Sequence, residues 1–351
     1  MLFDIANAQI SKLIIHKIGS RNDNTENTYS ERCVEFKEDN PVLGLLKQYF
    51  LATFNEPNLY HFTATNGDLN SNIVYQSANS IFDSKDTFYQ YSRVLADSLL
   101  EKSSHPNIKP GEFYLAMFEG VQIFDQEVRC LGLFKSETKE TFLRIMPNEG
   151  TIDIDCEEGI NIKKLDKGCL IFEVEHDNGY VVSVVDKVSK SNEAVFWKND
   201  FLNVEPREDN NYDTQNYLNI CKEFVDQVYA PVNDVPRESQ IDMKNRTIDY
   251  FKTNETFSED QFKNEVLEND DVKKAFDEYK QNYQQENGVN LNNQFTISND
   301  VVRQENKKFK SVLKLDKNFH IYIHGNQALI ERGFDNEKQL YFYKLFFQTE
   351  T

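Results

Sequence analysis

Several features are scarce or absent in this 351-residue sequence, and each absence excludes a class of protein. No run of about 18 apolar residues occurs, so no membrane-spanning helix is expected. The opening residues, Met-Leu-Phe-Asp-Ile, contain an acid and no basic segment before an apolar core, so no secretory signal is expected. The five cysteines are odd in number and widely spaced, which is typical of reduced, buried thiols in a cytoplasmic protein.

The common catalytic and nucleotide-binding motifs are also absent. The sequence has no G-x-x-x-x-G-K-[ST] loop, no G-x-G-x-x-G, no G-x-S-x-G and no H-E-x-x-H. His320 and His324 flank an alternating Ile-Tyr-Ile segment that predicts a strand, in which the two imidazoles stand about 13 Å apart. That separation is too large for two ligands of one metal ion. We therefore expect no cofactor and no enzyme, although a site assembled from distant residues stays open.

Positive charge is the scarcer sign. The chain has 39 Lys and Arg against 58 Asp and Glu, a net charge of −19. Such a chain repels a polyanion at long range, so nucleic-acid binding requires a concentrated basic patch. About half of the negative excess lies between Arg207 and Gly288, where 10 basic residues accompany 19 acids, a net of 10 − 19 = −9.

The stretch from Gly111 to Ile145 contains three apolar runs of strand length, separated by short polar breaks. This pattern predicts an antiparallel meander. From Phe113 to Phe118 the residues on both strand faces are apolar, which predicts a central strand covered on both sides. We place this meander at the middle of an N-terminal sheet domain.

The remaining patterns predict an α+β protein: an N-terminal antiparallel sheet domain with helices, a helical block, and a small C-terminal antiparallel sheet. The expected domains are residues 1–205, 206–290 and 291–351. His16, beside the first apolar run, is interpreted as structural. The individual predictions are a strand over Ile10–Gly19, helices over Pro41–Phe54 and Ser84–Lys102, a hairpin at Asn178-Gly179, four helices between Pro206 and Gly288 including one with a capping box at Ser258, a helical turn capped by Ser298 or Asn299, and strands over Phe309–Leu315, Phe319–Ile323, Ala328–Arg332 and Gln339–Phe347.

Asp153, Asp155 and Glu157 alternate along one predicted strand, so their carboxylates share a face. A row of carboxylates could hold a hard metal ion such as magnesium, as in a metal-dependent hydrolase. A solvated strand face is the favoured interpretation of the same pattern.

The densest basic run lies between Val301 and His320, where six basic residues accompany Glu305 and Asp316, a net of 6 − 2 = +4. Ammonium and guanidinium groups that neutralise phosphates release counterions, which gives salt-dependent binding of nucleic acid. An edge strand protected by lysines against aggregation is the alternative interpretation. A weaker cluster comprises Lys163, Lys164 and Lys167. The six candidate nucleic-acid-binding residues are Arg303, Lys307, Lys308, Lys310, Lys314 and Lys317.

The order of these segments resembles the bacterial nucleoid-associated protein family of the NdpA type, over nearly the whole chain. The segments that carry the resemblance are Ile10–Ile18, Leu95–Leu100, Gly111–Phe118, Phe319–His324 and Gln339–Tyr343. The resemblance implies a cytoplasmic, nucleoid-located protein that associates with double-stranded DNA, has no established enzymatic activity and self-associates.

Two functional hypotheses follow besides the metal-dependent hydrolase. In the first, the chain is a non-catalytic nucleoid-associated protein that binds double-stranded DNA through phosphates, with little sequence preference. In the second, its acidic helical block docks a DNA-handling protein partner at the nucleoid.

Overall fold

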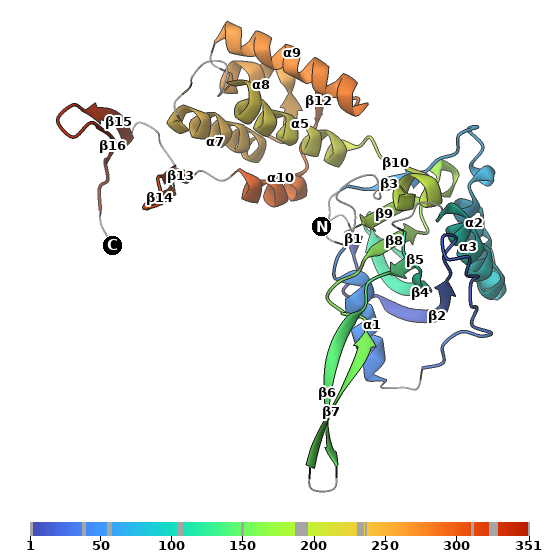
Figure 1. Ribbon diagram of the computed structural model, residues 1–351. Helices are drawn as coiled ribbons and strands as arrows, with labels where there is room; N and C mark the ends of the chain where they lie inside the picture. The colour runs from blue at the N-terminus through green and yellow to red at the C-terminus, as the bar shows by residue number, and fades with distance from the viewer. Residues whose placement is uncertain are drawn as a thin grey trace. The chain divides into compact units, whose positions relative to one another are not determined.

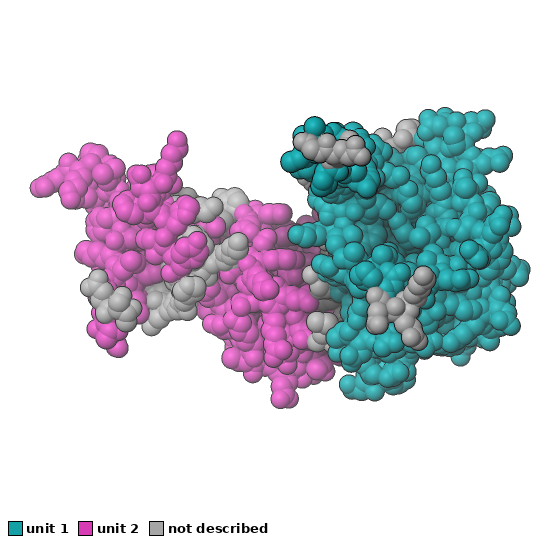
Figure 2. All heavy atoms as spheres, turned by 90° about the horizontal axis from the view of Figure 1, so that it is seen from below, with its two compact units in different colours: residues 1–207 teal, residues 208–351 magenta. Residues whose placement is uncertain are grey.

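The computed structural model describes residues 3–36, 40–54, 58–103, 108–148, 151–186, 196–229, 235, 237–267, 269–309, 312–322 and 329–349. The chain divides into two compact units, residues 1–207 and 208–351 (Figure 2). As predicted, the fold is α+β, with an antiparallel sheet and helices followed by a helical block and small antiparallel hairpins (Figure 1). None of the helices among the described residues is both long and apolar enough to cross a membrane.

The first unit is built on an eight-stranded sheet in which every pair of neighbouring strands is antiparallel. Its order is β1-β4-β5-β8-β9-β3-β10, and β2 also pairs with β4. The strand bounds are β1 (Phe3–Asp4), β2 (Gln9–Ile18), β3 (Tyr60–Phe62), β4 (Gly111–Ile123), β5 (Gln126–Ser136), β8 (Lys167–Phe172), β9 (Val181–Asp186) and β10 (Val204–Pro206).

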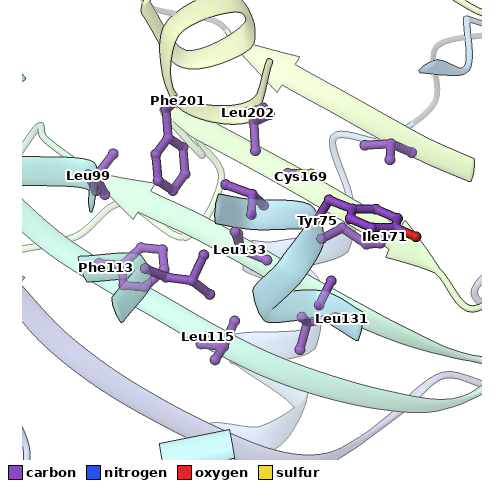
Figure 3. Packing of buried hydrophobic residues seen from close by; sticks show 14 of the residues in the cluster. Tyr75, Leu99, Phe113, Leu115, Leu131, Leu133, Cys169, Ile171, Phe201 and Leu202 are labelled. Atoms are coloured by element: carbon purple, nitrogen blue, oxygen red, sulfur yellow. The ribbon is translucent and has the colours of Figure 1, made fainter. Parts of the chain in front are cut away.

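Strand β4 lies between two hydrophobic cores, as its two apolar faces predicted. Phe113 and Leu115 face one core, with helices α2 (Ile73–Asp83) and α3 (Phe88–Lys102) and the π-helical segment η4 (Phe196–Leu202) (Figure 3). Tyr114 and Phe118 face the second core, together with Phe50 of helix α1 (Pro41–Leu51). The alternation of side chains along one strand therefore joins the two layers of the unit.

The prediction for the third strand of the meander is wrong. Strand β6 (Glu140–Asn148) does not join β5; it pairs with β7 (Thr151–Gly159), while β8 occupies the place beside β5. Where the chain leaves the sheet after β5, the carboxylate of Asp166 accepts the backbone N–H groups of Glu137 and Thr138, at 2.6 and 2.9 Å.

Other boundaries in this unit differ in detail from the predictions. Helix α2 was not predicted; it follows a short 3-10 turn, η1 (Leu69–Ser71). Helix α3 begins at Phe88, directly after a second 3-10 turn, η2 (Lys85–Thr87). The Asn178-Gly179 hairpin between β8 and β9 is confirmed. Its connection is longer than a two-residue turn and includes a 3-10 turn, η3 (His176–Asn178), followed by Gly179 at φ 84°.

The second unit begins with a helical block around a separate core rich in phenylalanine. Gly288, at φ 62°, ends its last long helix as predicted, whereas Ser258 forms no side-chain cap, so that capping box is wrong. The elements are α5 (Asn210–Phe224), η5 (Val225–Tyr229), α7 (Arg237–Thr253), β11 (Thr256–Ser258), α8 (Glu259–Val266), α9 (Asp270–Asn287), β12 (Gln294–Thr296), α10 (Asn299–Glu305) and η6 (Asn306–Lys308).

The C-terminal strands form two separate hairpins among the described residues. Strand β13 (Val312–Leu315) pairs with β14 (Phe319–Tyr322), and β15 (Ile330–Asp335) pairs with β16 (Leu340–Leu345). Ile241 of α7 packs against apolar residues of both hairpins.

Candidate nucleic-acid interface

The predicted basic residues that the structure describes follow one another on α10, η6 and the β13–β14 hairpin. Ser298 caps α10 as predicted, because its side-chain oxygen accepts the backbone N–H of Val301 at 3.4 Å. Val301 and Val302 are buried in the core of the helical block. The helix is therefore anchored by its inner face, and its outer face is left for polar side chains.

Arg303 lies on this outer face, and its side chain is 81% exposed. Its closest acidic partner is Asp300, with 3.8 Å between Nη1 and Oδ1. An exposed ion pair at that distance contributes little to stability. The guanidinium can therefore exchange it for the two oxygens of a phosphate, which its planar fork matches.

Lys307 and Lys308 are adjacent and exposed on η6, but their surroundings differ. The Nζ of Lys308 is 2.7 Å from Glu305, whose side chain is only 4% exposed. A buried carboxylate is costly without a partner, so part of the charge of Lys308 is committed to Glu305. Lys307 forms no ion pair with any residue that the structure describes.

The β13–β14 hairpin carries the next basic residues. Lys314 pairs in register with His320, whose side chain is exposed. Lys317 is exposed in the turn, where Asp316 adopts φ 51°, a left-handed conformation that Asp tolerates. Lys310 lies outside the described residues.

Many basic residues of the helical block are neutralised within the block. Lys244 Nζ is 2.5 Å from Asp226, and Lys263 and Lys280 both pair with Glu259. Burial also lowers the pKa of Lys244, although Asp226 opposes this effect. The acidic block therefore presents mainly its excess carboxylates, whereas Lys307 and Lys317 form no ion pair within the described part of the chain.

Two lysines of the weaker basic cluster are paired with acids, whereas Lys163 is exposed. Lys164 Nζ is 2.6 Å from Glu140. The side chain of Lys167 is 3% exposed and lies between Glu137 and Asp186, at 3.8 and 3.4 Å. Lys164 and Lys167 therefore form ion pairs with acidic residues of the first unit.

The acidic row lies on β7 and has the features of a solvated strand face. Asp153, Asp155 and Glu157 are exposed and follow at alternate positions, about 6.6 Å apart along a strand. Arg144, opposite Asp155 on β6, pairs with Glu157. Across the described ranges, no group of three His, Cys, Asp or Glu side chains is placed to hold a metal ion.

The sequence interpretation missed one surface of possible functional interest, the apolar face of the β6–β7 hairpin. Leu143 and Ile145 share this face on β6, where only Arg144 stands between them, and Ile152 and Ile154 alternate with Asp153 and Asp155 on β7. The sequence carries this signal, but its apolar runs predict a third meander strand for β6, and the carboxylates of β7 predict a solvated face or a metal site.

The family model of nucleoid-associated protein YejK matches residues 14–340, which includes the central sheet, the helical block and most of the C-terminal hairpins. A search of curated proteins finds no match.

Proposed function

The chain belongs to the nucleoid-associated protein YejK family, and from this premise we propose that it is a non-catalytic protein that binds double-stranded DNA at the nucleoid. The contacts would be to phosphates, so sequence preference would be weak. The residues proposed to carry them are Arg303, Lys307, Lys308, Lys310, Lys314 and Lys317.

The observation that supports this proposal most directly is the contrast in pairing within the second unit. Lys244, Lys263 and Lys280 are bound to acids of the helical block. Arg303 and Lys307, by contrast, are exposed on the outer side of an anchored helix and its following turn. A strongly anionic chain can approach DNA productively only through such a local excess of free positive charge.

A titration on a random-sequence duplex at several salt concentrations tests the proposal. If Lys308 stays with Glu305 and the other five residues engage, the logarithm of the affinity should fall with the logarithm of salt with a slope of about −4.5. This slope corresponds to a loss of roughly 500-fold between 50 and 200 mM salt.

Charge reversal distinguishes an effect of this patch on DNA binding from an effect of the net charge of the chain. The variant Arg303→Glu/Lys307→Glu/Lys317→Glu should abolish binding, because each reversal replaces a phosphate contact with repulsion. The matched control, Lys102→Glu/Lys252→Glu/Lys274→Glu, makes the same change in net charge at exposed positions elsewhere. Equal losses in both variants would remove these residues from the proposed interface.

The charge of the helical block favours a second candidate function, docking of a basic DNA-handling protein. Residues 207–288 carry a net charge of −9, and many of their lysines are already paired. Affinity purification with and without nuclease distinguishes the two functions. Partners that persist after DNA removal would indicate docking, and partners that are lost would indicate tethering through DNA.

A further inference from the structure

The β6–β7 hairpin is a two-stranded sheet of its own, which projects from the main sheet of the first unit (Figure 1). Its nine register pairs run from Glu140↔Gly159 to Asn148↔Thr151. Within the described ranges, no further strand pairs with either outer edge of this hairpin. A strand edge without a neighbour presents backbone N–H and C=O groups that can bind an additional strand.

The register indicates which backbone groups of β7 face outward. Pro147 has no N–H and stands opposite Ile152, as expected in a pair of residues that exchange no backbone hydrogen bonds. The backbone N–H of Cys156 donates to the side chain of its own neighbour, Asp155, at 2.8 Å. Because bonded and non-bonded pairs alternate, Ile152, Ile154 and Cys156 all direct their N–H and C=O groups away from β6.

The side chains along this edge of β7 alternate between apolar and acidic. Ile152 and Ile154 are 72% and 69% exposed and lie on one face of the hairpin. Asp153, Asp155 and Glu157 are exposed on the other face. The edge therefore offers an aliphatic surface on one side and a row of carboxylates on the other.

The outer edge of β6 is less suited to pairing. Pro147 cannot donate a hydrogen bond there, and proline on an edge strand is a device that prevents further pairing. On the acidic side of the hairpin, β6 carries Arg144, which pairs with Glu157 of β7. Strand β7 contains no proline from Thr151 to Gly159. Of the two edges, the β7 edge is therefore the open one.

We propose that the outer edge of β7 binds an extended segment of another protein, in which apolar and basic residues alternate, as a third antiparallel strand. The apolar side chains of the segment lie beside Ile152 and Ile154, and its lysines or arginines lie beside Asp153 and Asp155. Main-chain hydrogen bonds hold the segment, and the alternation of its side chains determines which segments bind. Aliphatic and opposite-charge pairs across neighbouring strands are stabilising.

The charge of the edge disfavours other occupants. The carboxylates repel the phosphates of DNA. A second copy of β7 would set carboxylates directly opposite carboxylates, which is destabilising. The edge from Thr151 to Glu157 is about 20 Å long and accommodates about seven residues, so binding should be weak and reversible. On binding, the N–H of Cys156 exchanges the Asp155 carboxylate for a carbonyl of the segment.

Two peptides of equal composition test the proposal on the full chain, independently of DNA. The first is acetyl-Lys-Val-Lys-Val-Lys-Val-Lys-amide, and the control, acetyl-Lys-Lys-Val-Val-Val-Lys-Lys-amide, has the same charge without the alternation. In fluorescence anisotropy at about 150 mM salt, which screens non-specific attraction, the alternating peptide should bind at least about 10-fold tighter. Its binding should also slow hydrogen exchange in residues 151–158, because outward N–H groups become bonded. Equal affinities, or binding without slower exchange there, would overturn the proposal.

Two matched proline substitutions identify the edge that binds. Ile154 and Ile145 face each other across the hairpin, and both direct their N–H groups outward. Ile154→Pro and Ile145→Pro therefore remove the same groups from opposite edges and leave the bonds between β6 and β7 in place. Ile154→Pro should weaken binding of the alternating peptide to the level of the control peptide, whereas Ile145→Pro should change it less than threefold. Equal losses in the two variants contradict the assignment to β7.

A pair of charge variants tests the acidic side without changing the backbone. Asp153→Asn/Asp155→Asn should weaken binding of the alternating peptide at least fivefold, because it removes two opposite-charge pairs. The matched control, Glu278→Gln/Glu286→Gln, removes two exposed carboxylates from α9 and should change the affinity less than twofold. The same affinity in both variants contradicts the proposal, and unchanged circular dichroism in both shows that the fold is intact.

Discussion

Protonation of His16 should destabilise the first unit as the pH falls below neutrality. The imidazole, on β2, is 1% exposed. Its Nδ1 accepts the backbone N–H of Ser30 at 3.2 Å, so Nε2 carries the proton and donates to Ser92 Oγ at 2.9 Å. Ser92 in turn donates to the carbonyl of Tyr89 at 2.7 Å. A second proton on the ring would sit on Nδ1, so Nδ1 could no longer accept the Ser30 N–H. It would also give a buried group a positive charge.

These contacts set the sign of the pH dependence. Burial, followed by the nearby Arg93, lowers the pKa of His16 from 6.5 to about 4, although Asp97 opposes the shift. The unfolded chain therefore takes up a proton near pH 6.5, whereas the folded chain does so only near pH 4. The stabilisation is complete above pH 6.5 and is lost as the pH falls towards 4.

The pKa difference also sets the size of the decrease in the free energy of unfolding. Between pH 7 and pH 5 the free energy of unfolding should fall by about 2 kcal/mol from His16 alone, and the full loss below pH 4 is about 3 kcal/mol. Carboxylates titrate in the same range, so the comparison must be made with His16→Gln, which is neutral at every pH. The excess loss in the wild-type protein is the contribution of the histidine.

Trp197 provides the assay. It is the only tryptophan in the chain, it is fully buried in the first unit, and its indole N–H donates to the carbonyl of Gly168. Its fluorescence in urea titrations therefore reports the unfolding of this unit without a signal from the helical block. Parallel stability profiles for the wild-type protein and His16→Gln between pH 7 and pH 5 would refute the reasoning.

Three further predictions concern single features of the structure. Gly179→Ala should destabilise the first unit by more than about 1 kcal/mol in the same urea titration, since Gly179 has φ 84° and an added Cβ would lie 2.3 Å from the carbonyl oxygen of Phe62; an unchanged midpoint would contradict this. Glu259→Ala should destabilise the second unit by about 3–5 kcal/mol, measured by circular dichroism, because it leaves the 9% exposed Lys280 without its partner, and Glu259→Gln/Lys280→Met should lose less. Ellman's reagent should react fastest with Cys156, the exposed thiol, because burial raises the pKa of Cys130, Cys169 and Cys221, and the fast phase should disappear in Cys156→Ser.

The sequence predicted well those elements whose signals are local. The apolar alternation along β4 identified a central strand, and Ser298 and Gly288 marked one helix start and one helix end. In each case the residues that determine the structure lie within a few positions of one another.

Long-range pairing was less accessible. The segment that forms β6 contains an apolar run of strand length, and nothing within it shows that it pairs with β7 and leaves the place beside β5 to β8. For the same reason the sequence could not show that Glu305 engages Lys308, because the burial of that carboxylate depends on how α10 packs. The sequence predicted that basic residues are concentrated in this segment. Which of them form ion pairs could be seen only in the tertiary structure.

The hydrogen bonds at the base of the β6–β7 hairpin have a mechanical consequence. Asp166 and Glu140 hold the hairpin where it leaves the sheet. The rest of the hairpin can therefore move only by bending of its two strands. The described end of the hairpin, at Met146 and Asp153, therefore keeps a defined distance and direction from the sheet of its own unit.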